Sequence, residues 1–174
     1  MEITPVMRKF ILHWGEMGTK WGINRSVAQI HALLYLAGEP LTADDMVEHL
    51  EIARSNVSMS LKELHSWGLI RTVHRTGERK EFYETQYDVW ELFRIILIER
   101  QRREIDPTVR LLDECVDESA AHEAAADPAR HQRLVAMQNF IHLSASWGHR
   151  TSSLPAPKMR KLAQLGDTIF RLLE

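Results

Sequence analysis

A chain of 174 residues with 44% hydrophobic and 26% charged residues has the composition of a globular protein, which excludes wholesale disorder. Its densest apolar run, Ile95 to Ile98, is far shorter than the ~20 residues that a bilayer-spanning helix needs, and the N-terminus has no apolar signal region. The one cysteine, Cys115, cannot form an internal disulfide, so a cytoplasmic protein without a membrane partner is predicted.

The net charge of −2 conceals two regions of opposite sign. Basic residues dominate between Ala53 and Lys80, whereas acidic residues dominate between Asp113 and Asp127. The basic segment could bind a polyanion in spite of the total charge, because local charge decides such contacts. An ordinary solvated surface is the alternative reading of either run.

Two helices are predicted before residue 40. The first, from Thr4 to Trp21, has apolar residues at spacings of three and four, which is typical of one helical face: Met7, Phe10, Trp14, Met17 and Trp21. After a break at Gly22, Asn24 is placed to cap a second helix. Its apolar stripe consists of Val27, Ile30, Leu34 and Ala37.

Residues 41–68 predict a short helix, a turn and a second helix. Thr42 and Asp45 have the spacing of a capping box for the short helix, which should turn Met46, Val47 and Leu50 inward. The second helix is predicted over residues 53–67, with Gly68 as its C-terminal cap. Its core-facing residues are Val57, Leu61 and Leu64.

The opposite face of the helix over 53–67 is unusual for a solvated surface. Such a surface usually carries long Glu and Lys side chains, but this one combines hydroxyls, an amide and cations: Arg54, Ser55, Asn56, Ser58, Met59 and Lys62. Small polar side chains allow close approach to a DNA groove and hydrogen bonds to phosphates or base edges. A merely serine-rich surface helix is the competing interpretation.

A β-hairpin is predicted after this helix, because residues 69–75 and 80–86 are rich in β-branched and aromatic side chains on either side of a turn containing Gly77. Arg75, Arg79 and Lys80 lie at its tip. A basic loop beside a helix that can enter a DNA groove is suited to contacts with phosphates or with the minor groove.

Long helices are predicted for residues 88–174. The first begins near Asp88, is kinked or restarted at Pro107 and continues to about Ala121, with Val89, Phe93, Ile96 and Leu97 expected to face inward. Asp127 and Pro128 begin another helix, whose apolar stripe is Leu134, Met137, Ile141 and Ala145. After a loop over 151–157, a last stripe consists of Leu162, Leu165, Ile169 and Leu172. These two stripes predict an antiparallel helical hairpin that packs in a dimer.

The predicted fold class is therefore mainly α with a small β-wing: a winged helix-turn-helix plus a helical dimerisation region. The winged helix-turn-helix is assigned to residues 22–87, and the dimerisation region to residues 1–21 and 88–174.

Several segments resemble the GbsR-like branch of the MarR family of transcriptional regulators. They are residues 29–36, 41–45, 53–64, 67–70, 88–94 and 102–107. The resemblance covers roughly Phe10 to Leu112, is most specific in the helix over 53–67 and in the segment after the wing, and weakens beyond Ala120. It implies a homodimeric winged-helix repressor or activator, with the helix in the major groove and the wing at the minor groove.

Carried onto this chain, the resemblance implies helix contacts to DNA from Arg54, Ser55, Asn56, Ser58 and Lys62, and wing contacts from Arg79 and Lys80. The branch includes regulators of glycine betaine synthesis and uptake that sense choline-like compounds. A small-molecule effector is therefore a candidate partner, although a DNA-binding motif does not identify it.

A quaternary ammonium effector would need an aromatic cage, for which the chain offers Trp14, Trp21, Tyr35, Trp67, Trp90 and Trp147. Most of these residues lie on apolar stripes, where core or interface packing is the competing explanation. His131, His142 and His149 are spaced by eleven and seven residues, about 10 Å or more along a helix, so the three cannot share one metal ion.

The sequence therefore predicts a homodimer that reads a pseudo-palindromic operator with the helix over 53–67 and the wing over 75–80, as a repressor. Its predicted partners are double-stranded DNA and a second copy of itself. No nucleophile and base pair, phosphate-binding loop or HExxH motif occurs, so neither an enzyme nor a cofactor or metal site is predicted. The alternatives are a winged-helix protein-interaction module and a redox sensor acting through Cys115.

Overall fold

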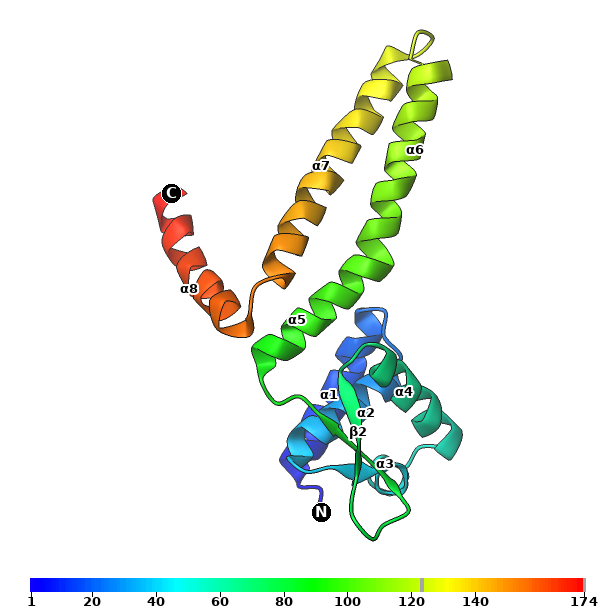
Figure 1. Ribbon diagram of the computed structural model, residues 1–174, viewed down its shortest axis with the longest axis vertical. Helices are drawn as coiled ribbons and strands as arrows, with labels where there is room; N and C mark the ends of the chain where they lie inside the picture. Colours follow the sequence, from blue (N-terminus) through cyan, green and yellow to red (C-terminus); the bar gives the residue numbers. More distant parts are fainter. Residues whose placement is uncertain (123, 174) are drawn as a thin grey trace. The chain divides into compact units, whose positions relative to one another are not determined.

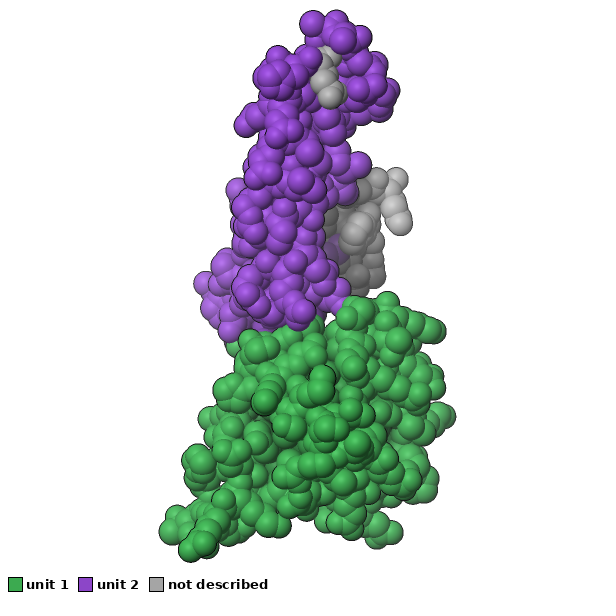
Figure 2. Space-filling view, turned by 90° about the vertical axis from the view of Figure 1, so that its right-hand side faces the viewer, with its two compact units in different colours: residues 1–92 green, residues 93–174 purple. Residues whose placement is uncertain are grey.

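The computed structural model describes residues 1–122 and 124–173, and side chains as far as residue 166. The described chain is mostly helical with one three-stranded sheet (Figure 1), which confirms the predicted fold class of a mainly α protein with a small β-wing. Its contacts divide it into unit 1, Met1–Leu92, and unit 2, Phe93–Glu174 (Figure 2). Among the described residues, none of the helices is both long and apolar enough to cross a bilayer.

Unit 1 begins with two helices whose N-terminal caps are made by side chains. Helix α1 (Pro5–Lys20) starts where the Thr4 hydroxyl accepts a hydrogen bond from the Met7 amide at 3.2 Å. Helix α2 (Arg25–Ala37) starts where Asn24 accepts one from the Ser26 amide at 2.9 Å, so the predicted Asn24 cap is confirmed. Each cap satisfies an amide that has no partner within its own helix.

The face of α1 that packs on α2 differs from the predicted aromatic stripe. The buried residues of α1 are Ile11, Gly15 and Gly18, and a Cβ atom added to Gly18 would lie 2.5 Å from Cβ of Ala28. The glycines therefore let the two helices approach closely. The predicted stripe of Met7, Phe10, Trp14, Met17 and Trp21 is half-buried or, at Trp21, exposed.

The sheet has the antiparallel order β1-β3-β2. Strands β2 (Ile70–His74) and β3 (Glu81–Thr85) form the predicted hairpin, with Ile70 opposite Thr85. The third strand, β1 (Leu41–Thr42), was not predicted; it pairs with β3 through Leu41 opposite Tyr83. The wing is thereby joined to the segment that leads into the helix-turn-helix.

Helix α3 (Ala43–Leu50) begins with the predicted capping box. The Asp45 amide donates to Oγ1 of Thr42 at 3.2 Å, and the Thr42 amide donates to Oδ2 of Asp45 at 2.7 Å. Met46 is fully buried, as predicted, whereas Val47 and Leu50 are half-buried. Together with Met46, the largest fully buried side chains of the described residues are Ile30, Leu33, Leu34, Val57 and Leu64, all in unit 1.

A buried polar chain crosses the core of unit 1. Nε2 of His31 on α2 lies 3.2 Å from Oγ1 of Thr85 on β3, and the Thr85 hydroxyl donates to the carbonyl oxygen of Leu69 at 2.8 Å. Burial lowers the pKa of His31 from 6.5 to about 4, because desolvation penalises the charged imidazolium. His31 is therefore neutral at physiological pH and can donate through Nε2.

The first helices of the C-terminal half differ partly from expectation. Helix α5 (Val89–Arg100) exposes Val89 and Phe93, which were expected to face inward, and buries Leu92 and Glu99. It continues into a π-helical turn, η1 (Gln101–Ile105), and then α6 (Asp106–His122). The expected irregularity near Pro107 thus takes the form of a π turn, because proline lacks the amide that a regular helix would use.

Helix α7 (Pro128–Ser152) forms a hairpin with α6 (Figure 1), whereas the prediction paired it with α8 (Ala156–Leu173); the contacts of the described residues show the α6 pairing and no comparable one with α8. Oδ1 of Asp113 on α6 accepts hydrogen bonds from Gln138 at 2.8 Å and lies 2.7 Å from Nε2 of His142. His131 contacts Ser119 and His149 contacts Asp106 in the same seam. Polar contacts therefore bridge α6 and α7 at several positions along the hairpin. The predicted stripe residues Ile169 and Leu172 lie outside the described side chains.

Candidate nucleic-acid interface

Helix α4 (Arg54–Ser66) presents two contrasting faces. Its buried face consists of Val57, Ser60, Leu61 and Leu64, where the Ser60 hydroxyl donates to Oγ of Ser26 on α2 at 3.1 Å. Its exposed face carries the six residues that the sequence singled out: Arg54, Ser55, Asn56, Ser58, Met59 and Lys62. The core thus holds α4 in a fixed orientation, with the polar face turned to solvent.

Gly68 ends α4 as predicted. Gly68 adopts a φ of +72°, and its amide donates to the carbonyl oxygen of His65 at 3.0 Å. The amide of Leu69 donates to the carbonyl oxygen of Leu64, also at 3.0 Å. This pair of bonds is the Schellman motif, which favours glycine because other residues are strained at positive φ. The chain leaves α4 here and enters β2, so a short turn at Gly68 links the helix to the wing.

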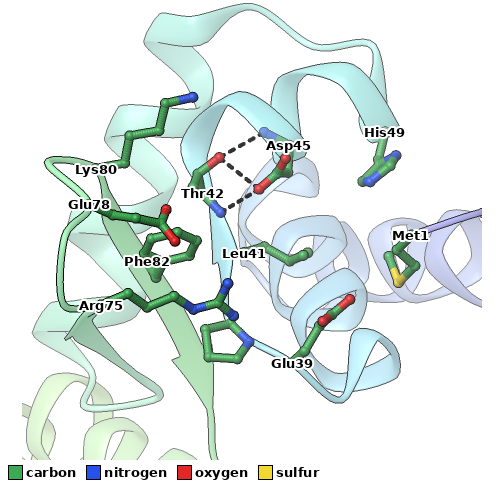
Figure 3. A pocket seen from close by; sticks show the side chains of 11 residues that line it. Met1, Glu39, Leu41, Thr42, Asp45, His49, Arg75, Glu78, Lys80 and Phe82 are labelled. Carbon is green, nitrogen blue, oxygen red and sulfur yellow. Dashed lines mark hydrogen bonds between the residues drawn. The ribbon is translucent and has the colours of Figure 1, made fainter.

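The basic turn over 75–80 lies on the exposed tip of the wing. The guanidinium of Arg75 lies 4.3 Å from the centroid of the Phe82 ring, a cation–π contact. Arg75 and Lys80 line a hollow of about 340 Å³ together with Phe82 and with Asp45 of α3 (Figure 3). Arg79 is exposed.

A second hollow, of about 580 Å³, lies between α4 and the wing. Arg54, Ser58 and Lys62 line it from α4, and Tyr83 lines it from β3. Because adjacent residues of a strand point to opposite faces, Phe82 and Tyr83 place the two hollows on opposite sides of the sheet. The predicted DNA contacts are therefore divided between two concave surfaces. Arg75 lines the first hollow, on the side of the sheet opposite the hollow that α4 lines.

Asp44 is a residue of this surface that the sequence reasoning missed. Its carboxylate, on the first turn of α3, forms an ion pair with Arg54 and lies 3.4 Å from Nζ of Lys80. The hydrogen bond from Arg54, followed by that from Lys80, lowers the pKa of Asp44 below its usual value. Two of the predicted DNA-contacting cations thus share one anion. No spacing rule reveals such a pairing, because the three residues come together only in the fold.

Tyr83 supplies a neutral polar group to the second hollow. Burial, and then the hydrogen bond that its hydroxyl donates to Glu81 at 2.7 Å, raise the pKa of Tyr83 to about 12. The phenol therefore stays protonated and adds no negative charge beside Arg54 and Lys62.

The aromatic residues predicted for an effector cage are found in separate contacts. Trp14 stacks on Phe10 at 5.3 Å between centroids and meets Trp21 edge-on at 5.6 Å, whereas Tyr35 lies 6.3 Å from Tyr87. Trp67 is the C-terminal cap residue of α4, and Trp90 lies in the first turn of α5; both are half-buried. None of these residues lines either of the two hollows described above, so the effector site stays a prediction.

Cys115 lies half-buried on α6. The alternative of a redox sensor therefore stays a hypothesis for this residue.

Known proteins resemble both the sequence and the fold. The model of the MarR family matches residues 21–80. The HTH-type transcriptional repressor GbsR of Bacillus subtilis (strain 168) is 26% identical over 94 residues, which cover 54% of this chain and 52% of the repressor. The chain therefore matches about half the length of that relative.

A crystal structure described as that of a transcriptional regulator superposes with a TM-score of 0.64 at 15% identity, and the match covers 85% of this chain and 96% of that one. This likeness concerns the fold. The family match spans α2, α3, α4 and β2. It therefore includes the exposed polar face of α4 and the elements on either side of that helix in the sequence. Together with the identity to GbsR, it supports the resemblance of the chain to the GbsR-like branch of the MarR family.

Proposed function

We propose that the protein is a homodimeric DNA-binding transcriptional regulator, with repression as its mode of action. The observation that carries the proposal is the exposed face of α4, where hydroxyls, an amide and the cations Arg54 and Lys62 stand opposite a buried apolar face. Such a helix can approach a major groove closely while the core fixes its orientation. The similarity to GbsR, which is a transcriptional repressor, supports repression as the mode of action.

In the proposed complex, α4 enters the major groove and the wing tip contacts phosphates beside the minor groove. Ser55, Asn56 and Ser58 supply short hydrogen-bonding groups for base edges or phosphates. Arg79 and Lys80 supply charge from the wing. In a symmetric dimer, the two α4 helices would lie about 34 Å apart, so that each reads one half of a pseudo-palindromic operator.

The outer surface of α7 supports a dimer. Phe140, Leu143 and Trp147 recur at spacings of three and four and are 61%, 72% and 66% exposed in the single chain. At about 100° per residue they lie opposite the side on which Gln138 and His142 contact α6. An exposed apolar stripe of this kind is typical of a protein interface, and a second copy of the chain is its proposed occupant.

Replacing Arg54 and Arg79 together by Ala is expected to weaken binding to a duplex from the chain's own upstream region by about 10- to 100-fold. Each substitution removes a proposed phosphate contact, so the slope of log affinity against log salt should become shallower by about 0.9 per lost contact. Fluorescence anisotropy over a salt series measures both quantities.

The matched control is Arg133→Ala with Lys161→Ala, which removes the same charge from exposed positions on α7 and α8. This control should bind like the parent. Unchanged affinity in the Arg54 and Arg79 variant would refute these contacts. A parent protein that shows no salt-dependent binding to its upstream duplex would instead favour the protein-interaction module.

Replacing Phe140 and Trp147 by Glu is expected to convert the dimer into a monomer, because each buried carboxylate would lose its hydration in an apolar interface. Sedimentation velocity measures the oligomeric state, and Gln132→Glu, an exposed change near the start of α7, is the control. A variant that remains dimeric would place the interface elsewhere.

A further inference from the structure

Asp44 joins three elements of unit 1 through one carboxylate. Arg54, which pairs with its Oδ1, is the first residue of α4, and Lys80, 3.4 Å from its Oδ2, ends the wing turn. Asp44 itself belongs to the first turn of α3. The carboxylate therefore lies between the start of the proposed recognition helix and the proposed minor-groove element.

Stability alone gives little reason for this arrangement. The side chains of Asp44, Arg54 and Lys80 are 58%, 60% and 64% exposed, and ion pairs between exposed side chains contribute little to folding. The same carboxylate reduces the attraction of the surface for DNA, because it neutralises part of the cationic charge and repels phosphates. Its effect on binding should therefore exceed its effect on folding.

We propose that Asp44 is a specificity-determining residue that acts as the internal counter-ion of Arg54 and Lys80. Its ion pairs with the two cations are replaced only by DNA phosphates that reach both of them. The proposal rests on the proposed DNA-binding function. On a duplex whose phosphates reach neither cation or only one, the carboxylate keeps its partners and lowers the general electrostatic attraction. On an operator that presents phosphates to both, the cations change partners, and Asp44 stays at the N-terminal end of α3, where a negative charge is favourable.

Asp44→Asn tests this role, because it keeps the shape of the side chain and removes its charge. Binding to a scrambled-sequence duplex of about 30 base pairs, enough for two half-sites one turn apart, should become three- to tenfold tighter. Its salt slope should steepen by about 0.9 per protomer, since one further charge becomes available to phosphate. Binding to the duplex from the upstream region should tighten less, so the ratio of the two affinities should fall.

Glu48→Gln is the matched control, since it makes the same charge change on the same helix at an exposed residue. It should alter the affinity for the scrambled duplex by less than about twofold, because among the described contacts Glu48 pairs with neither cation. If Glu48→Gln matched the effect of Asp44→Asn, total charge would be the cause and the proposal would be wrong.

A second background separates direct from indirect effects. In a variant with Arg54→Ala and Lys80→Ala, Asp44→Asn should change binding to the scrambled duplex, measured at low salt, by no more than the roughly twofold expected of Glu48→Gln, because only the direct repulsion between the carboxylate and phosphates remains. Equal tightening in that background, or weaker binding to both duplexes in the otherwise native protein, would overturn the proposal. Thermal unfolding of each variant verifies the fold. If the parent bound neither duplex, the DNA-binding function itself would fail, and this role with it.

Discussion

Replacing Leu64 by Ala is expected to lower the free energy of unfolding by about 2 to 5 kcal/mol. Leu64 is 1% exposed on the core side of α4, where it packs in the same core as Val57 and Met46. The truncation removes apolar contacts and leaves a cavity that a densely packed core closes only in part. Urea unfolding followed by circular dichroism measures the loss.

Met59→Ala is the counterpart on the opposite face of the same helix, where Met59 is 69% exposed. It should leave the free energy of unfolding within about 0.5 kcal/mol of the parent value, because no buried contact is lost. Under the proposed function it should nevertheless weaken binding to the upstream duplex. A loss below about 1 kcal/mol for Leu64→Ala would contradict the two-faced arrangement of α4.

Acidification is expected to destabilise unit 1 through His31. The folded-state pKa of His31 is about 4, lowered by burial from the 6.5 of an exposed imidazole, so the unfolded chain binds the proton more strongly. The contribution of the neutral His31 to the free energy of unfolding is therefore fully present above about pH 6.5 and is lost as the pH falls towards 4. The loss should reach on the order of 3 kcal/mol at the acid end.

His31→Gln provides the comparison, since an amide can still donate to Oγ1 of Thr85 and does not titrate. The free energy of unfolding of this variant should change less between pH 7.5 and pH 4 than that of the parent, by about 3 kcal/mol at most. Taking the difference between the two proteins cancels the contributions of other titrating groups, such as Asp113, whose pKa is lowered by its hydrogen bond with His142. Parallel pH curves for the two proteins would show that His31 takes up its proton over the same pH range in the folded and the unfolded state, and would contradict a lowered pKa.

Helix boundaries in this chain were predictable because they depend on local chemistry. Asn24, Thr42 with Asp45 and Asp127 mark helix starts through hydrogen bonds within a few residues, and each of these caps is present in the structure. Gly68 marks a helix end for a local reason, its positive φ. The exposed face of α4 was predictable for a similar reason, since helical periodicity around Val57, Leu61 and Leu64 fixes which residues point outward.

The unpredicted features depend on residues that are distant in sequence. Strand β1 is two residues long and exists because β3 pairs with it. The face of α1 was missed because Gly15 and Gly18 bury no side chain of their own and leave no hydrophobic signal. The partner of α7 was missed because the seam with α6 is joined by polar side chains such as Asp113 and His142. Periodicity of apolar residues detects neither glycine contacts nor polar seams.

The π-helical turn at Gln101–Ile105 sets the rotational phase of the long C-terminal helix. Its cap bond runs from the Asp106 amide to the carbonyl oxygen of Gln101, one residue further than in an α-helix. A turn with one additional residue offsets every later side chain by about 100° around the axis. A heptad counted along α5 consequently loses its frame before α6, and an alignment with a relative whose helix is regular would need a single-residue gap here. The length of this turn thus decides which side chains of α6, Asp113 among them, are presented to α7.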